Sequence, residues 1–121
     1  MEKEFVPYEQ ALALKELGFD EPCFGYFDPL YKQLVVWEKE STNSSSNWVS
    51  APLYQQAFRW FREKHNLDSF VKHLYIQTVK VGYYFGIDEY KGKEYQSEHF
   101  KTYEEAELEC LKKLIEIVKD K

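Results

Sequence analysis

Cysteine and long hydrophobic runs are scarce in this chain of 121 residues. Its 2 cysteines, Cys23 and Cys110, both lie within apolar patterns, which predicts small buried side chains in a reducing compartment and no disulfide. No apolar run approaches the roughly 18 residues that a membrane-spanning helix needs, and the opening Met-Glu-Lys-Glu is unlike a signal peptide. We therefore expect a cytoplasmic protein that does not engage a membrane.

Motifs that carry chemistry are also missing. The 5 glycines are scattered, so the sequence holds no phosphate-binding loop or dinucleotide fingerprint. The 3 histidines, His65, His73 and His99, fall in different predicted elements without the spacing of zinc ligands. Glu107 lies on the apolar side of a predicted helix. Its position near the helix start and at the rim of the core explains the acid, because a negative charge there complements the helix dipole. With no separated pair of carboxylates, we expect no enzyme, no cofactor and no metal.

Hydrophobic and aromatic residues are plentiful. The chain contains 10 Tyr, 9 Phe and 3 Trp, and 44% of its residues are hydrophobic. This is enough to build a core, and the length predicts a single compact domain over 1–121. The net charge of −5 disfavours duplex DNA as a partner. A mild excess of basic residues in 41–101 leaves a small anionic ligand open.

Three segments have the pattern of amphipathic helices. The first runs from Pro7 to Leu17 and stops at Gly18. The second runs from about 51 to 65 with Ser50 as its N-cap, and the third starts at Thr102 in a capping box and continues almost to the end.

Strand patterns separate these helices. A serine- and asparagine-rich stretch lies between the predicted strand 31–37 and the second predicted helix, and it predicts a flexible loop at 40–47. The order α-β-β-α-β-β-(β)-α predicts an α+β fold: one antiparallel sheet of four to five strands with three helices mainly on one face. The predicted strands are 23–27, 31–37, 71–79, 82–88 and the polar 93–100.

The amino-acid sequences of the three predicted helices resemble those of known proteins. The segments 5–23, 51–65 and 102–115 resemble small uncharacterised proteins encoded by phages and prophages of gut bacteria. Since that family has no established activity, the resemblance implies a mobile-element origin and assigns no catalytic residue.

Two features stand out as candidate binding sites. Arg59 and Arg62 are the only arginines in the sequence and share the polar side of the second helix. The planar guanidinium suits carboxylates, so this ridge could recognise an acidic protein partner. Pairing with nearby glutamates of the same chain is the simpler interpretation. If the ridge binds, Arg62→Glu should abolish capture of the partner without changing stability.

Tyr84, Asp88 and Tyr90 fall on one side of the strand 82–88 and its extension, opposite Tyr83 and Phe85. Such a tyrosine face could stack a base, whereas cross-strand packing of tyrosine is the simpler interpretation. The leading hypothesis is therefore a phage-encoded accessory protein that binds a protein. The alternative is sequestration of a small nucleotide or single-stranded nucleic acid on the tyrosine face.

Overall fold

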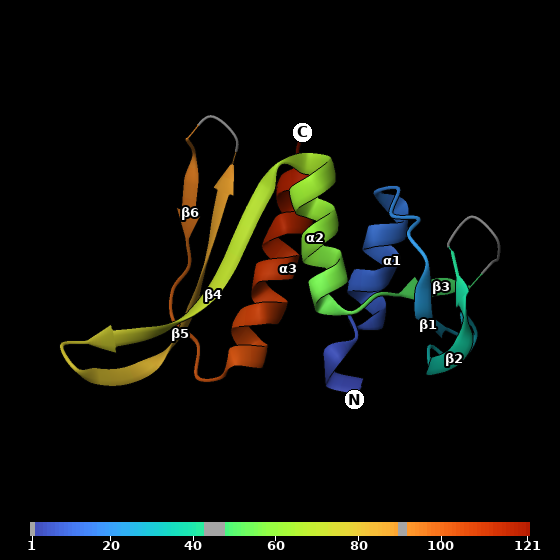
Figure 1. Ribbon diagram of the computed structural model, residues 1–121, viewed down its shortest axis with the longest axis horizontal. Coiled ribbons are helices and arrows are strands. Elements are labelled where there is room, and N and C mark those ends of the chain that lie inside the picture. The colour runs from blue at the N-terminus through green and yellow to red at the C-terminus, as the bar shows by residue number, and fades with distance from the viewer. Residues whose placement is uncertain (1, 43–47, 90–91) are drawn as a thin grey trace. The chain divides into compact units, whose positions relative to one another are not determined.

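Helices and strands alternate along the computed structural model, which describes residues 2–42, 48–89 and 92–121 (Figure 1). The chain divides into two compact units, Met1–Ala57 and Phe58–Lys121. In chain order the elements are a 3-10 turn (Glu2–Glu4), α1 (Tyr8–Glu16), β1 (Cys23–Phe27), β2 (Leu34–Ser41), β3 (Val49–Ala51), α2 (Tyr54–His65), β4 (Leu67–Ile76), β5 (Val79–Glu89), β6 (Glu94–Gln96) and α3 (Tyr103–Lys119).

The first unit packs α1 against a three-stranded antiparallel sheet in the order β2-β1-β3. Pro7 is the N-cap of α1, and Gly18 follows the helix with φ of 98°, as the sequence predicts. The helix buries Leu14 fully, and Tyr8 meets the ring of Phe27 edge-on at 5.5 Å. Alternate residues of β1 are buried, which places one face of the strand in the core.

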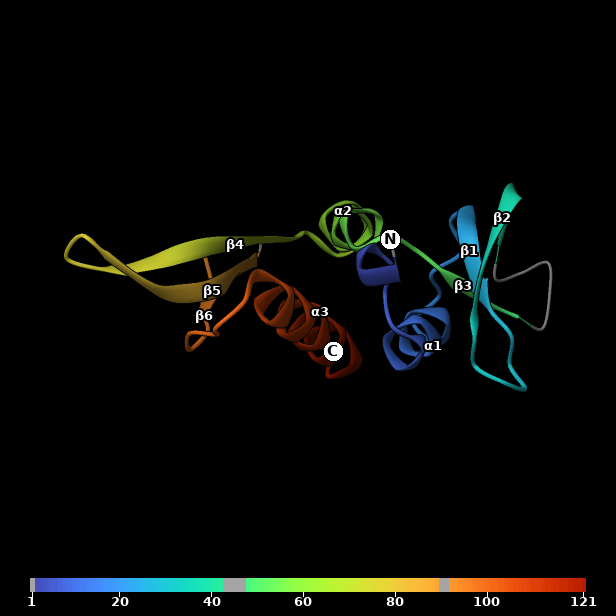
Figure 2. The same ribbon diagram turned by 90° about the horizontal axis from the view of Figure 1, so that it is seen from below.

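The second unit contains a sheet in the order β4-β5-β6, also antiparallel, with α3 against one face (Figures 1 and 2). Phe85 and Ile87 of β5 are 3% and 1% exposed. The α3 side of this core is fully buried at Cys110, Leu111 and Leu114. Burial of alternate strand residues therefore fixes which face of the sheet carries the helix.

Helix α2 begins in the first unit and ends in the second. Trp60 and Phe61 are buried, with ring centroids 5.0 Å apart, and the ring of His65 lies 4.9 Å from that of Trp60. Asn66 ends the helix with φ of 55°, a left-handed conformation that asparagine tolerates at helix ends. Helical periodicity places both rings on the apolar side of the segment 51–65, in agreement with their burial.

Four expectations about the fold are wrong. The strands form two three-stranded sheets and not one sheet of four or five. Ser50 is no N-cap, because it is buried in β3 opposite Tyr26 of β1, and α2 starts only at Tyr54. The strand β2 begins at Leu34 and extends through Ser41, so part of the predicted loop at 40–47 is strand; residues 43–47 lie outside the described part. In each case pairing with a distant strand, which local patterns do not reveal, decided the outcome.

The remaining difference is the β4–β5 turn. It falls at Gln77 and Thr78, inside the segment that reads as one continuous strand over 71–79. Neither residue is a typical turn former.

Candidate protein-binding surface on the second unit

Side chains of β4 and β5 alternate between the face that meets α3 and the opposite face, here called the outer face. Its residues come in cross-strand pairs: Asp68 with Asp88, Phe70 with Gly86, and Lys72 with Tyr84. Tyr84 and Asp88 of the predicted tyrosine face thus share one surface, on the side of β5 opposite Phe85 and Ile87, as expected. Tyr90 lies outside the described residues.

Aromatic rings cover the middle of the outer face. The Phe70 ring lies directly on Gly86, so closely that a Cβ atom there would overlap it. Tyr84 meets the Phe70 ring edge-on at 5.9 Å, and Lys72 Nζ lies 4.6 Å from the centre of the same ring. Tyr84 therefore packs across the strands against Phe70, as the simpler interpretation predicts. The sequence did not predict that Lys72 would lie beside this pair of rings.

One end of the outer face is acidic. Asp68, Asp88 and Glu94 stand opposite one another on β4, β5 and β6. Like charges in directly opposed positions destabilise a sheet, so this row favours a neighbouring positive charge. Within the described ranges, no group of three or more His, Cys, Asp or Glu residues is arranged to hold a metal ion.

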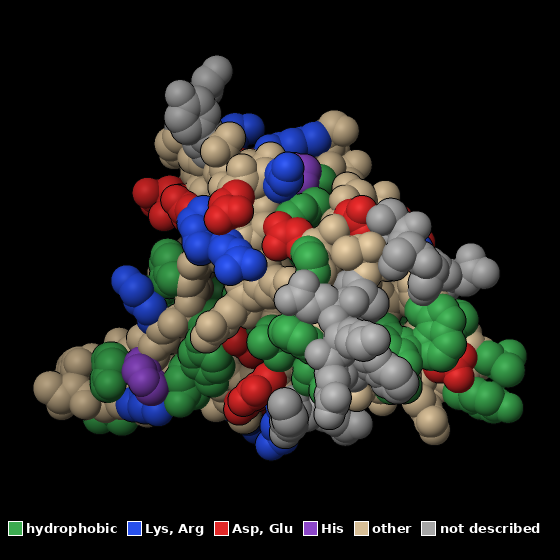
Figure 3. All heavy atoms as spheres, turned by 45° about the vertical axis from the view of Figure 1, so that its right-hand side comes forward, with side chains coloured by type: hydrophobic (Ala, Val, Ile, Leu, Met, Phe, Trp, Pro, Cys, Tyr) green, Lys and Arg blue, Asp and Glu red, His purple; other side chains and the backbone are tan. Residues whose placement is uncertain are grey.

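The far end of the β4–β5 hairpin is apolar, and it is called the hairpin tip. It consists of Tyr75, Ile76, Val79 and Val81, which are 55%, 62%, 63% and 38% exposed. No acidic residue occurs between Asp68 and Asp88. Figure 3 shows green side chains at this end of the hairpin, at the left of the view, with blue lysine side chains beside them.

Lysines hold fixed positions along this hairpin. Lys80 Nζ donates a 2.9 Å hydrogen bond to the Tyr83 hydroxyl and lies 4.6 Å from the centre of that ring. Lys72 sits over Phe70 as described above. The hairpin therefore presents exposed apolar side chains together with ordered positive charge.

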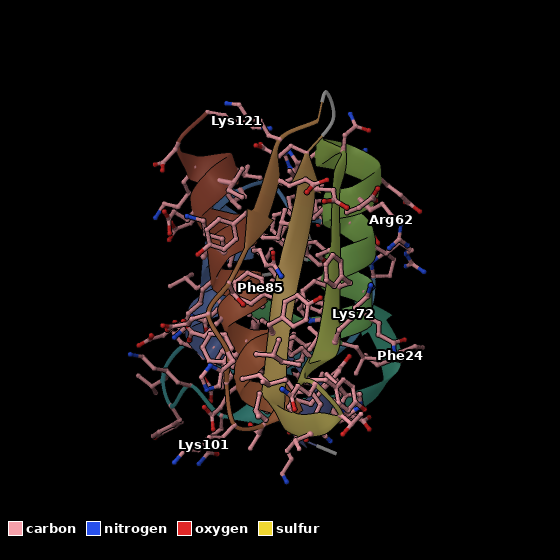
Figure 4. All side chains as sticks on the ribbon, turned by 90° about the vertical axis from the view of Figure 1, so that its left-hand side faces the viewer. Phe24, Arg62, Lys72, Phe85, Lys101 and Lys121 are labelled. Atoms are coloured by element: carbon pink, nitrogen blue, oxygen red, sulfur yellow. The ribbon has the colours of Figure 1, made fainter. Side chains whose placement is uncertain are left out.

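The predicted arginine ridge lies on a different element. Arg59 and Arg62 are exposed on α2, one helical turn apart, whereas Trp60 and Phe61 are buried. Figure 4 shows Arg62 on the outer side of the helix. The structure thus places the two arginines as predicted but on an element separate from the outer face.

A shallow pocket of about 360 Å³ lies between α3 and the strands β5 and β6. Its floor is a stack of rings in which Phe85 lies 5.8 Å from Tyr95 and 6.1 Å from Phe100. Two ion pairs line its rim, Lys112 with Glu109 at 3.0 Å and Lys113 with Glu116 at 3.1 Å. Since these lysines already face carboxylates, the pocket offers a ligand less unmatched charge than the hairpin does.

The amino-acid sequence contains no motif that predicts this pocket. Its lining comes from β5, β6, the segment 97–100 and α3, which only the folding of α3 against the sheet brings together. The alternation of aromatic residues in β5 was the one sequence signal that could have pointed to it.

Two ionisable groups of α3, the half-buried Glu107 and the buried Cys110, have strongly raised pKa values. Burial, with a smaller contribution from Glu104, raises the pKa of Glu107 to about 7. Burial also raises the pKa of the Cys110 thiol to about 12, against a hydrogen bond with Ser69 that lowers it. A thiol with this pKa stays protonated and is a poor nucleophile. Both cysteines are buried and neither forms a disulfide, as predicted from the sequence.

Comparisons with protein-family models, with curated proteins and with solved structures give no match to this chain. Among the described residues, no helix is long and apolar enough to cross a membrane.

Proposed function

We propose that the protein is a small accessory protein, encoded by a phage or another mobile element, that acts by binding a protein partner. The origin rests on the family resemblance of the helical segments. The binding role rests on one observation, the hairpin tip. Contiguous exposed apolar side chains are a frequent mark of interaction surfaces, and here they occupy the end of a single paired hairpin.

The side chains of the hairpin indicate the surface chemistry that a protein partner would need. Tyr75 and Ile76 offer large side chains of the kind that fill pockets at the centre of an interface. Lys72 and Lys80 are the charged residues nearest to them on the hairpin, and no acid intervenes. The complementary surface is therefore an apolar groove rimmed by carboxylates.

Substitution of the tip tests the proposal. The double variant Ile76→Ser/Val79→Ser removes two exposed apolar side chains, so stability should change little while capture of the partner from host lysate is lost. Leu30→Ser is the matched control, because Leu30 is 76% exposed but lies in the first unit. Arg62→Glu examines the arginine ridge in the same assay. Capture of the same protein by wild type and by the tip variant would contradict the proposal.

A second candidate function is the binding of a small nucleotide on the outer face. The observation that favours it is Lys72 beside the rings of Phe70 and Tyr84, since a base could stack there and a phosphate meet the lysine. A tight ligand raises the melting temperature by mass action. A nucleotide that does so for wild type and not for Lys72→Ala would support this function, and the absence of any shift across a nucleotide panel would contradict it.

A further inference from the structure

Among the described residues, no strand pairs with the outer edge of β4, so backbone hydrogen-bonding groups there face no neighbouring strand. The sheet order is β4-β5-β6, so β4 is an edge strand of ten residues. In Figure 4 it forms the right-hand side of the sheet, where Lys72 is labelled. Exposed edges of this kind readily pair with another strand.

The hydrogen bonds of β5 identify which residues of β4 face outward. Tyr83 exchanges backbone hydrogen bonds with Phe100, and the Phe85 carbonyl accepts from the Ser97 amide. Odd-numbered residues of β5 therefore point their backbone groups away from β4, and even-numbered residues point toward it.

Because backbone groups alternate in direction along a strand, the residues at the free edge of β4 can now be identified. Because Lys72 pairs with Tyr84 and Phe70 with Gly86, the even residues of β4 bond to β5. The odd residues, Ser69, Val71 and His73, direct their N–H and C=O groups outward.

Three common means of blocking an edge, a proline, a bulge and a row of like charges, are absent between Leu67 and Leu74 of this strand. From Leu67 to Leu74 the β4–β5 register is regular and contains no proline, and the one irregularity in the pairing comes after Leu74. The exposed charged residues in this stretch, Asp68 and Lys72, have opposite signs. They repel most incoming strands less than a row of lysines would.

We propose that β4 pairs with β4 of a second copy of this chain, antiparallel and about a two-fold axis through Phe70. Such an axis must run perpendicular to the sheet, since only then do the two strands lie antiparallel. It keeps the outer faces of both copies on the same side. Residues that face each other are therefore both even or both odd, and this leaves only registers centred on a residue.

Charge selects one register among these. With Phe70 at the centre, Asp68 of each copy stands opposite Lys72 of the other, and the two Phe70 residues face each other across the axis. Centring on Lys72 would oppose two lysines, and centring on Val71 would place Asp68 opposite Leu74. Opposite charges in facing positions stabilise a strand pair and like charges destabilise it, so the Phe70 register is favoured.

The neighbouring acids support the same arrangement. Asp68 is the last member of the row that continues through Asp88 to Glu94. Lys72 of the second copy would extend this row with a positive charge. Ser69 would stand opposite Val71 of the second copy, where the outward backbone groups of both residues can bond.

Charge reversal tests the pairing. Sedimentation equilibrium should show a concentration-dependent dimer for the wild type. Asp68→Lys and Lys72→Asp each create two like-charge pairs across the axis, so each alone should weaken the dimer by roughly tenfold to a hundredfold. An equal mixture of the two variants should restore the dimer, because in the mixed pair both contacts become Lys opposite Asp. Lys93→Asp, an exposed change outside β4, should leave the wild-type affinity unchanged.

A measurement on the wild type provides an independent check. Amide exchange at Ser69 and Val71 should slow as the protein concentration rises, with no such change in α3. The proposal is overturned by a wild-type protein that stays monomeric, by single variants that dimerise like wild type, or by a mixture that fails to pair. It is also overturned by edge amides whose exchange ignores concentration. Because the hairpin tip is not part of this contact, loss of partner capture and loss of dimerisation are separable results.

Discussion

At the scale of single residues, Glu107 links the packing of α3 to pH. It lies in the first part of a helix whose following turns are buried at Cys110 and Leu111. Its pKa is raised to about 7 by burial and by Glu104. Partial removal of a carboxylate from water favours its neutral form, which is the physical cause of the larger effect.

The substitution Glu107→Gln should stabilise the protein in a pH-dependent way. Glu107 ionises at lower pH in the unfolded chain than in the folded one, so the folded state holds the extra proton up to a pH of about 7. The free energy of unfolding therefore falls as pH rises from the ordinary glutamate pKa toward that value. Glutamine carries no charge and escapes this loss. The gain in melting temperature over wild type should thus be larger at about pH 8 than at about pH 4.

Thermal melts at the two pH values measure this difference. Glu105→Gln is the control, because Glu105 is exposed in the same turn of α3. A gain for Glu107→Gln that is equal at both pH values would contradict the elevated pKa.

Single residues also show which contacts can be predicted from the sequence and which cannot. The burial of Trp60 and Phe61 and the shared face of Tyr84 and Asp88 follow from helical and strand periodicity, and the structure confirms them. The contact of Phe70 with Gly86 does not follow from either period. It depends on the register between two strands, which local sequence does not specify.

At the scale of elements, the β4–β5 turn carries strain that the sequence does not announce. Gln77 adopts φ of 58° although it has a side chain. That region is sterically unfavourable for L-residues other than glycine. Thr78, the other residue of the turn, is not among the residues with positive φ.

Replacement of Gln77 by glycine should raise the stability of the protein. Gln77→Gly removes the steric strain of a side chain at positive φ. We therefore expect the free energy of unfolding to increase by about 0.5–1 kcal/mol. Thr78→Gly adds the same chain flexibility without relieving a positive φ, so it should lower stability instead. Urea denaturation of both variants measures the difference, and a Gln77→Gly protein less stable than wild type would be incompatible with the strained turn.

Caps and turns divide the elements into those that could be predicted and those that could not. The Thr102 hydroxyl accepts a 3.1 Å hydrogen bond from the Glu105 amide, as the capping box predicts. The start of α3 is set by neighbours within one turn, so local sequence suffices there, whereas the start of α2 falls at Tyr54 because Ser50 pairs with β1. The strand β3 is set instead by its pairing with β1, in which Ser50 lies opposite Tyr26.

At the scale of the whole molecule, α2 belongs to both units. Its first turn falls in Met1–Ala57 and the rest in Phe58–Lys121. Unfolding of either unit would therefore break hydrogen bonds in a helix on which the other also depends. Helix formation is cooperative, so the two units are expected to lose their structure together.

Calorimetry should accordingly show one unfolding transition. The calorimetric enthalpy should equal the van't Hoff enthalpy, which is the signature of two-state behaviour. A protein with two separable transitions, one retaining the ring contacts of Trp60, would show that the units unfold independently and would contradict the prediction of one domain.

The sequence by itself determined that the chain forms three helices, that Thr102 caps α3 and that Gly18 follows α1, because these features depend on residues within a few positions of one another. It also determined that β5 has one apolar face. Only the tertiary structure decided that the strands form two sheets, that Phe70 covers Gly86, and that Asp68, Asp88 and Glu94 stand in one row. Strand pairing joins residues far apart in the chain, and its register is chosen by the packing of the whole unit.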